Sequence, residues 1–289
     1  MKSLYVSQSH QPPGQAALPA AGHHVNRRDF GKTALAATAA LFLSRDSFAL
    51  NPVPSPRPES STAKNVVLVH GAFADGSSWS RVIPLLEAMG FNVSAVQNPL
   101  TSLDDDVRTT RRLLAQQNGP TLLVGHSYAG FVITEAGKAP NVTGVVYVSS
   151  YGPDQGESHD DLVKRFPSPA GLPAIRLDEN GFLWIAREQF HEAFAHDVDL
   201  PQANIMAVVQ KPVSKKNCFG VPVGAPAWKS KPSWFVISTD DRLINPELQR
   251  FVAKRMGATS ISVPSSHASL VSHPVEVANF IAEAANHKS

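Results

Sequence analysis

The chain has 289 residues but only one cysteine, few charged residues and no long apolar run. Cys218 has no second cysteine to pair with, so an internal disulfide is excluded. Charged residues make up 17% of the chain and hydrophobic residues 43%, which favours one soluble globular domain with a sizeable core. Without a run of about 18 apolar residues, no membrane span is predicted, and we expect no stable membrane insertion.

The first fifty residues differ from the rest of the chain. A charged segment containing Arg27-Arg28 precedes the apolar stretch 33–43, and Ser47-Phe48-Ala49 has the small-x-small pattern of a cleavage site. This layout resembles a twin-arginine export signal. We therefore expect residues 1–49 to be an export signal that directs the protein to the periplasm. Cleavage after Ala49 stays open, and an uncleaved tail or an amphipathic anchor is the alternative.

The small basic excess of the chain belongs to this predicted signal. The chain has 26 basic and 24 acidic residues, of which five basic and two acidic lie in 1–49, so 21 and 22 remain after cleavage, a net charge of −1. A nucleic-acid partner is therefore not predicted. Residues 50–63, rich in proline and serine, are interpreted as a linker into a domain that spans 64–289.

From residue 65 onward, apolar runs alternate with helical patterns. The predicted strands are 65–69, 91–96, 121–124, 142–149, 233–238 and 260–263, and the predicted helices are 78–89, 103–117, 128–138, 246–256 and 275–285. Apolar strands separated by helices indicate a parallel sheet covered on both faces. We predict a doubly wound α/β fold whose mostly parallel sheet has about six strands.

This alternation is lost between about residues 153 and 231, where prolines and aromatic residues are scattered. The stretch is too long for a plain loop in a compact domain. We predict a helical cap inserted over the C-terminal edge of the sheet, where ligands bind in open α/β sheets.

The segment from Gly125 to Gly130 lies between a predicted strand and a predicted helix, and Ser127 stands at its centre. A serine between small residues on a strand-to-helix turn is typical of a nucleophile elbow. Gly125 and Ala129 are the small residues that let strand and helix approach, although glycine is usual where Ala129 stands. We predict that Ser127 is a nucleophile.

A serine nucleophile needs a base and an acid that orients the base, and in this fold they follow the serine in the order acid, then histidine. Asp240-Asp241 follow the predicted strand 233–238, and His267 follows the strand 260–263. We favour Asp241 as the acid, because apolar Leu243-Ile244 follow it closely, and His267 as the base. The alternatives are Asp240, Asp154 or Glu157 as the acid and His273 as the base.

An oxyanion hole needs two backbone N–H groups aimed at the developing negative charge. The residue after the nucleophile, Tyr128, is one predicted donor. The loop after the first strand, His70-Gly71-Ala72-Phe73, supplies the other, and Ala72 is favoured because Gly71 lets the backbone come close.

Two other strings are interpreted as carrying no chemistry. His191 and His196 lie five positions apart, too far around a helix to share a metal, so we expect a solvated cap helix. Asp104-Asp105-Asp106 is expected in the exposed first turn of its helix. No metal and no cofactor are predicted.

From about residue 64 onward, the chain resembles the α/β-hydrolase superfamily. The string Val69-His70-Gly71-Ala72-Phe73, the Gly-His-Ser-Tyr elbow and the late Ser-His loop look like its small branch of plant-type esterases and hydroxynitrile lyases, with their bacterial relatives. The resemblance implies that Ser127 is the nucleophile, Asp241 the orienting acid and His267 the general base, with Ala72 and Tyr128 forming the oxyanion hole.

The resemblance also separates two chemistries. Plant-type lyases of this branch carry threonine where this chain has Gly71, and lysine where Ala268 follows His267. Both differences favour hydrolysis of a small or medium apolar carboxylic ester through an acyl-enzyme. The alternatives are amide or C–C cleavage, lyase activity, or a small-molecule binder without catalysis. The substrate's acyl and alcohol groups and the oligomeric state stay open.

Overall fold

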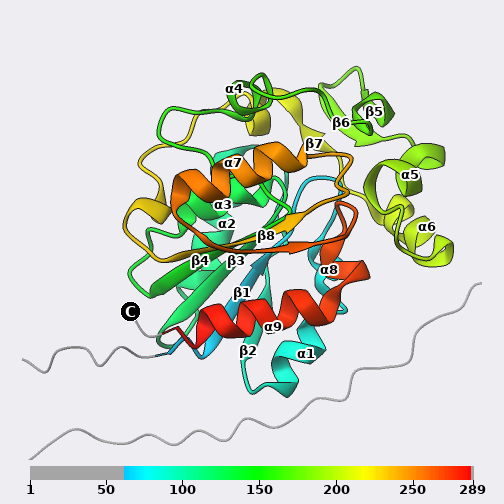
Figure 1. The fold of residues 1–289 in the computed structure, drawn as a ribbon. Coiled ribbons are helices and arrows are strands. Elements are labelled where there is room, and N and C mark those ends of the chain that lie inside the picture. The colour runs from blue at the N-terminus through cyan, green and yellow to red at the C-terminus, as the bar shows by residue number, and fades with distance from the viewer. Residues whose placement is uncertain (1–61, 288–289) are drawn as a thin grey trace, which may run out of the picture. The chain divides into compact units, whose positions relative to one another are not determined.

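A computed structural model describes residues 62–287; the predicted signal 1–49 and most of the predicted linker lie outside this range. The main sheet has six parallel strands in the order β2-β1-β3-β4-β8-β9 (Figure 1). The strands are β1 Asn65–Val69, β2 Asn92–Ala95, β3 Thr121–His126, β4 Val142–Val148, β8 Ser233–Ser238 and β9 Thr259–Val263. The predicted doubly wound α/β fold with about six strands is confirmed.

The register of the central strands brings distant parts of the chain to one edge. In β1 and β3 every side chain is buried, as expected for strands covered on both faces. Val69 of β1 pairs with Gly125 of β3, and His126 pairs with Val148 of β4. The loops that follow these three strands therefore meet at the C-terminal edge of the sheet.

Helices cover both faces of the sheet (Figure 1). The helix α1 Ile83–Ala88 lies with α9 Pro274–Ala285 on one face, and the other face carries α2 Leu103–Leu114, α3 Ala129–Ala136 and α7 Pro246–Met256. The predicted helix 78–89 is wrong in its first half, where a 3₁₀ turn spans Gly76–Trp79. Pro84 has no N–H to donate, so it fits only the first turn of α1. Within residues 62–287, none of the helices combines the length and apolarity that a bilayer span requires.

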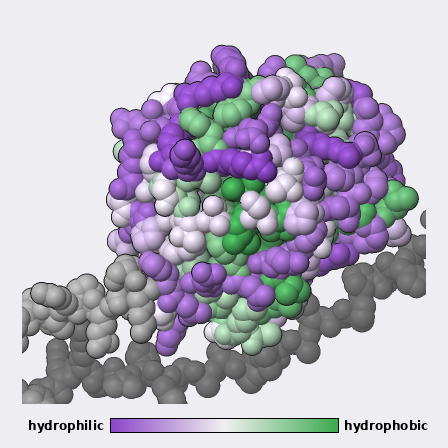
Figure 2. Space-filling view, in the orientation of Figure 1, coloured by the Kyte–Doolittle hydropathy of each residue, from purple (hydrophilic) through white to green (hydrophobic). Residues whose placement is uncertain are grey.

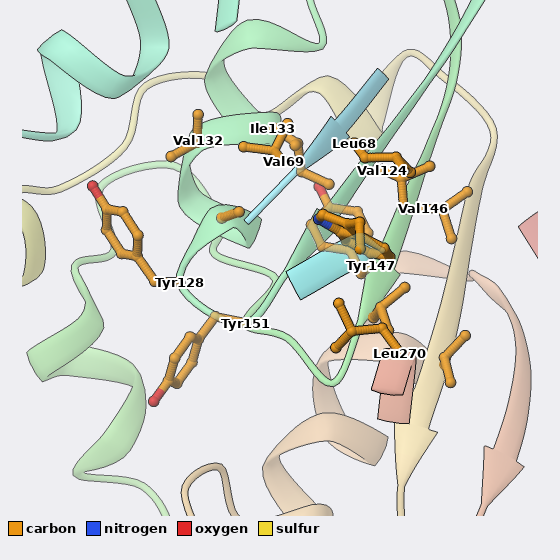
Figure 3. Close-up of a cluster of buried hydrophobic side chains, with 14 of the residues drawn as sticks. Leu68, Val69, Val124, Tyr128, Val132, Ile133, Val146, Tyr147, Tyr151 and Leu270 are labelled. Atoms are coloured by element: carbon orange, nitrogen blue, oxygen red, sulfur yellow. The ribbon is translucent and has the colours of Figure 1, made fainter. Parts of the chain in front are cut away.

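Packing of α3 onto the central strands forms the core behind the predicted nucleophile. Figure 3 shows Ile133 of α3 close to Val69 at the end of β1, with Leu68 and Val124 farther along the strands. A Cβ at Gly125 would lie 2.9 Å from the Ile133 side chain, so only glycine lets α3 pack this closely. The elbow is therefore held by buried apolar contacts on both sides.

The region between β4 and β8 forms the cap, which is not only helical as predicted. It contains the helices α4 His159–Val163, α5 Phe190–Phe194 and α6 Leu200–Val209, with short helical turns at Leu172–Ala174, Arg187–Gln189, Lys215–Phe219 and Ala227–Lys229. It also contains an antiparallel sheet of β5 Ile175–Leu177, β6 Phe182–Ile185 and β7 Val213–Ser214. A tight turn joins β5 to β6: Gly181 has a φ of 82°, and the Asp178 carboxylate accepts the Asn180 and Phe182 N–H groups.

Candidate active site

Ser127 occupies a strained turn between β3 and α3. Its φ of 56° lies in the left-handed region, which is uncommon for a residue with a side chain. The turn is held by the Ser127 N–H, which donates to the Val148 carbonyl oxygen (3.1 Å), and by its own carbonyl, which accepts from the Ser150 hydroxyl (2.6 Å). A Cβ at Gly130 would lie 2.0 Å from the Tyr151 oxygen, so the next turn also depends on glycine. Backbone strain supported in this way is typical of functional sites.

Ser127, His267 and Asp241 form one hydrogen-bonded chain. His267 Nε2 lies 2.8 Å from Ser127 Oγ, and His267 Nδ1 lies 2.7 Å from Asp241 Oδ2. All three residues are at most 6% exposed. With Asp241 ionised, Nδ1 carries the proton, and the free Nε2 faces the serine hydroxyl as an acceptor.

The acid is held by four hydrogen bonds. Asp241 Oδ1 accepts the N–H groups of Leu243 (2.8 Å) and Ile244 (2.9 Å), and Oδ2 accepts Gln249 Nε2 (2.8 Å) in addition to His267. Gln249 lies on the buried face of α7, and its amide oxygen accepts the Ser238 N–H of β8 (3.0 Å). Sequence reasoning missed this residue, since a single glutamine on a helix carries no motif.

The alternative acids and base lie elsewhere. Asp240 is exposed and its carboxylate accepts the Thr239 hydroxyl, whereas Asp154 pairs with Lys229. Glu157 pairs with Arg165 and Arg255. The imidazole of His273 contacts Ser272 at the start of α9. The structure thus brings Asp241 and His267, and none of these alternatives, to Ser127.

The loop after β1 presses directly against the elbow. A Cβ at Gly71 would lie 2.7 Å from the Ser127 Cβ. Burial lowers the pKa of His70 to about 4, so its neutral ring donates from Nδ1 to the Gly71 carbonyl oxygen (2.8 Å) and accepts the Asn98 N–H at Nε2 (2.9 Å). Ala72 and Tyr128, the predicted oxyanion donors, line the same cavity as Ser127.

Asp106 corrects one prediction. Asp104 is exposed in the first turn of α2, but Asp106 is fully buried, because the helix turns its third acidic residue toward the sheet. Its carboxylate accepts the Tyr128 hydroxyl (2.9 Å) and the Leu100 N–H (2.9 Å). Burial raises its pKa to about 6. Asp106 therefore anchors the side chain of the residue that follows the nucleophile.

His126, directly before Ser127, bonds the backbone of His267. Burial holds its pKa well below the ordinary value, so the ring is neutral and its Nε2–H donates to the His267 carbonyl oxygen (2.9 Å). The two imidazole centroids lie 4.8 Å apart. The only available signal for this role was its place in the elbow string.

The cap segment from His191 to Asp197 contains the expected cap helix, α5, on which Glu192 is exposed, but the residues that follow the helix bond both the acid loop and the base loop. His196 Nε2 bonds the Asp240 carbonyl oxygen (3.0 Å), and Asp197 Oδ2 accepts the Ser266 N–H (2.9 Å) next to the base. Glu192 pairs with Arg242 of the acid loop. Within residues 62–287, no cluster of three or more His, Cys, Asp or Glu side chains has the arrangement of a metal site.

A cavity of about 640 Å³ opens above Ser127 and His267. Most of its wall is apolar and comes from the cap and from the loop that leads into α7, with Phe166, Leu172, Leu183, Phe219, Leu243 and Leu248 among the lining residues. In the space-filling view, apolar surface between α4 and α7 is surrounded by hydrophilic residues (Figure 2). The arrangement places the Ser127 hydroxyl and the His267 imidazole at the floor of an apolar cavity.

Known proteins are similar to this chain in sequence and in fold. The pyrethroid hydrolase of Sphingobium wenxiniae is 26% identical over 262 residues, which cover 78% of this chain and 89% of that protein. Methylesterase 8 of Arabidopsis thaliana is 25% identical over 219 residues, 67% of this chain and 78% of that protein. The crystal structure of a pyrethroid hydrolase from Sphingobium faniae JZ-2 has a TM-score of 0.66 at 24% identity, covering 78% of this chain and 98% of that one.

A sequence profile of a protein family matches most of the residues that the structure describes. The profile described as alpha/beta hydrolase family matches residues 66–280, which run from β1 into α9 and include the elbow, the acid loop, the base loop and the cap. With the parallel sheet and the strained serine turn at its C-terminal edge, this match shows that the chain belongs to the alpha/beta hydrolase family.

Proposed function

We propose that the protein is a serine hydrolase that cleaves a small or medium apolar carboxylic ester through an acyl-enzyme. Ester hydrolysis in general is supported by the relatives, among them a pyrethroid hydrolase and a methylesterase. The observation that carries the proposal is the chain Asp241–His267–Ser127, with distances of 2.7 and 2.8 Å, at the floor of an apolar cavity.

The proposed mechanism has two halves. Ser127 Oγ attacks the ester carbonyl carbon while His267 Nε2 takes the hydroxyl proton, and Asp241 stabilises the imidazolium that forms. The alcohol leaves with that proton, and the acyl group stays on Ser127. In the second half, His267 takes a proton from a water molecule whose oxygen attacks the acyl carbon, and it returns that proton to Ser127 Oγ as the acid leaves.

Two backbone N–H groups, of Ala72 and Tyr128, are proposed to bind the oxyanion in both halves. Both residues line the cavity beside Ser127. Each lies in a turn that tight contacts fix in advance, because Gly71 packs against the nucleophile and Asp106 anchors the Tyr128 side chain. Donors fixed before the reaction need no reorganisation when charge develops, which is the main requirement for this kind of stabilisation.

Ester hydrolysis is favoured over cyanohydrin cleavage at two positions. The Gly71 backbone leaves no space for the threonine of plant-type lyases, since a Cβ there would also lie 2.9 Å from the His126 oxygen. Ala268 follows the base and is fully buried, so no lysine ammonium is available there. Amide or C–C cleavage and non-catalytic binding are the remaining alternatives.

Labelling and turnover test the proposal together. A fluorophosphonate probe is expected to label the wild type and the control variant Ser230→Ala, whose hydroxyl bonds the Ala227 oxygen away from the cavity, but not Ser127→Ala. Hydrolysis of short-chain esters by Ser127→Ala should fall by roughly 10⁴-fold or more. Full turnover by Ser127→Ala contradicts the mechanism. Tight ester binding by a wild type that neither hydrolyses nor labels identifies a binder instead.

Export is a separate proposal on residues 1–49. The charged segment with Arg27-Arg28, the apolar stretch and the small-x-small site support it. In a host with a twin-arginine pathway, changing both arginines to lysine should retain the protein inside the cell. The intact mass of exported protein shows whether the chain begins at Leu50.

A further inference from the structure

The cavity contains a second carboxylate–imidazole–hydroxyl chain, built from the loop after β4 and from the cap helix α4. His159, at the start of α4, places Nδ1 3.1 Å from Asp160 Oδ1 and Nε2 3.1 Å from Tyr151 Oη. All three residues line the cavity that Ser127 and His267 line. Tyr151 follows β4, and its ring extends on the same side of the elbow as that of Tyr128 (Figure 3). The proposed reaction uses none of these three side chains.

The imidazole in this chain is held in one orientation. The His159 ring stacks on Phe219, with centroids 4.4 Å apart and an interplanar angle of 24°. The Tyr151 ring meets it edge-on at 4.9 Å. The turn that precedes it is fixed by a capping box, in which Ser158 and Asp161 bond each other's backbone N–H groups. Packing therefore fixes the plane of the ring, and the hydrogen bonds at its two ends select which ring atoms face Asp160 and Tyr151.

The protons in this chain can be assigned from its ends. The hydrogen bond from His159 and the nearby Lys164 and Lys215 ammonium groups lower the pKa of Asp160, so its carboxylate is ionised and can only accept. Nδ1, which faces this carboxylate, is then the ring nitrogen that carries the proton in the tautomer the hydrogen bond selects, and Nε2 of that tautomer is an acceptor. The Tyr151 hydroxyl must donate to Nε2, because burial raises its pKa and keeps the proton on the oxygen.

One lone pair of Tyr151 Oη is then left for a ligand. Among residues 62–287, the hydroxyl has one hydrogen-bond partner, His159 Nε2, which takes its proton. Tyr151 as a whole residue is 6% exposed, so its hydroxyl gains little from bulk water. A buried acceptor in an apolar cavity favours a ligand that brings a donor to it.

We propose that Tyr151 Oη, oriented by His159 and Asp160, is a specificity subsite that accepts a hydrogen bond from a hydroxyl or N–H group of the substrate. The inference rests on the proposed function and names the substrate class: apolar, ring-sized esters with one donor on the acyl or alcohol part. Tyr151 is a binding residue here, and His159 and Asp160 are positioning residues.

The test compares esters that differ only in the group offered to this oxygen. Methyl 2-, 3- and 4-hydroxyphenylacetate carry a donor, and the matching methoxyphenylacetates place an acceptor without a donor at the same positions. At about pH 8, where imidazole is ordinarily neutral, the wild type should prefer one hydroxy ester over its methoxy partner by roughly tenfold in kcat/KM. Tyr151→Phe should abolish that preference by slowing the hydroxy ester alone.

Two further variants separate recognition from folding. Tyr147→Phe is the matched control, because this buried tyrosine of β4 bonds Thr134 and lies outside the cavity lining, so it should keep the preference. His159→Phe keeps the stack on Phe219 but removes the acceptor for the Tyr151 hydroxyl. That hydroxyl then donates into the cavity, and the preference should invert toward the methoxy ester.

Binding is measured separately from turnover. Calorimetry on Ser127→Ala, which leaves the esters intact, should show the same preference and its loss in Ser127→Ala/Tyr151→Phe. If the preference in binding persists while the wild type hydrolyses neither ester, the subsite holds and the proposed function fails. Equal losses for hydroxy and methoxy esters in Tyr151→Phe, or the absence of any preference in the wild type, overturn the subsite.

Discussion

Two carboxylate–imidazole–hydroxyl chains reach the same cavity, one ending at Ser127 and the other at Tyr151. In the first, Asp241, His267 and Ser127 are at most 6% exposed, and the two distances are 2.7 and 2.8 Å. In the second, the side chain of Asp160 is 51% exposed and that of His159 18%, and both distances are 3.1 Å.

The two chains therefore contain the same chemical groups in the same order but differ in burial and in the elements that carry them. The first chain lies on loops that follow β3, β8 and β9, and Asp241 accepts four hydrogen bonds that fix both carboxylate oxygens. The second lies on the loop after β4 and one short cap helix, and water competes for its carboxylate. Burial makes the first suited to stabilising a charge change, whereas the second can orient a hydroxyl for recognition.

The largest effect is expected from Asp241→Asn. Leu243 and Ile244 donate to Oδ1, so the amide oxygen of asparagine takes that place and its NH₂ group faces His267 Nδ1. The imidazole is then held in the wrong tautomer, and kcat should fall by about 10⁴-fold. The neighbouring exchange Asp240→Asn, at an exposed side chain, should change kcat by less than about twofold. A large loss at Asp240 instead would reassign the acid.

A smaller effect is expected from the cap segment that clamps the first chain. Asp197→Asn weakens the bond to the Ser266 N–H, and the base loop gains freedom next to His267. We expect kcat to fall roughly tenfold with KM little changed, because a displaced base affects the chemical step more than binding. Asp199→Asn, an exposed cap of α6 that asparagine also satisfies, is the matched control. An unaltered kcat in Asp197→Asn would mean that the clamp is dispensable.

The fold and the first chain were predictable because their signals are local. Apolar runs located the six strands, and β1, β8 and α7 have the predicted bounds. Each of Ser127, Asp241 and His267 follows a strand, and parallel strands collect their C-terminal ends at one edge, so sequence order predicted their proximity. The structure brings these three side chains together.

The second chain was not predictable, because it depends on where the cap folds, and Gln249 was missed because a single glutamine on a helix carries no motif. His159 and Asp160 are adjacent in a polar stretch that looks solvated, and only the packing of α4 over Tyr151 and Phe219 gives them partners. The β5–β6 hairpin has a local signal, the turn sequence Asp-Glu-Asn-Gly. The prolines and aromatic residues of the surrounding segment led instead to the prediction of a helical cap.

A still smaller loss of activity is expected from a substitution of Asp160, the carboxylate of the second chain. The Asp160 side chain is half exposed, so an asparagine amide there can turn its oxygen toward His159 Nδ1. Asp160→Asn should therefore lower kcat/KM for hydroxyphenylacetate esters by about threefold at most, which is far less than the loss at Asp241. A loss comparable with that of Asp241→Asn would show that the two chains are equivalent. Initial rates across the ester pairs measure this.

The smallest effect on rate is expected from a substitution of Asp106. Its buried carboxylate also bonds a hydroxyl, that of Tyr128. Its pKa of about 6 lies above the ordinary 3.8, so between these values the folded protein holds a proton that the unfolded chain has released. Its contribution to stability is thus greatest below about pH 4 and falls by about 3 kcal/mol as the pH rises past 6.

Asp106→Asn removes this titration, while its amide can still meet Tyr128 and the Leu100 N–H. The unfolding free energy of the variant minus that of the wild type should therefore rise between about pH 4 and 6 and then level off. Asp104→Asn, which changes the same charge at an exposed position of the same turn, is the control and should show no comparable rise. Urea unfolding across this range measures both differences. If the difference in unfolding free energy for Asp106→Asn does not change with pH in this range, the buried carboxylate is ionised throughout. Burial alone would then not distinguish its ionisation from that of the exposed carboxylate of the second chain.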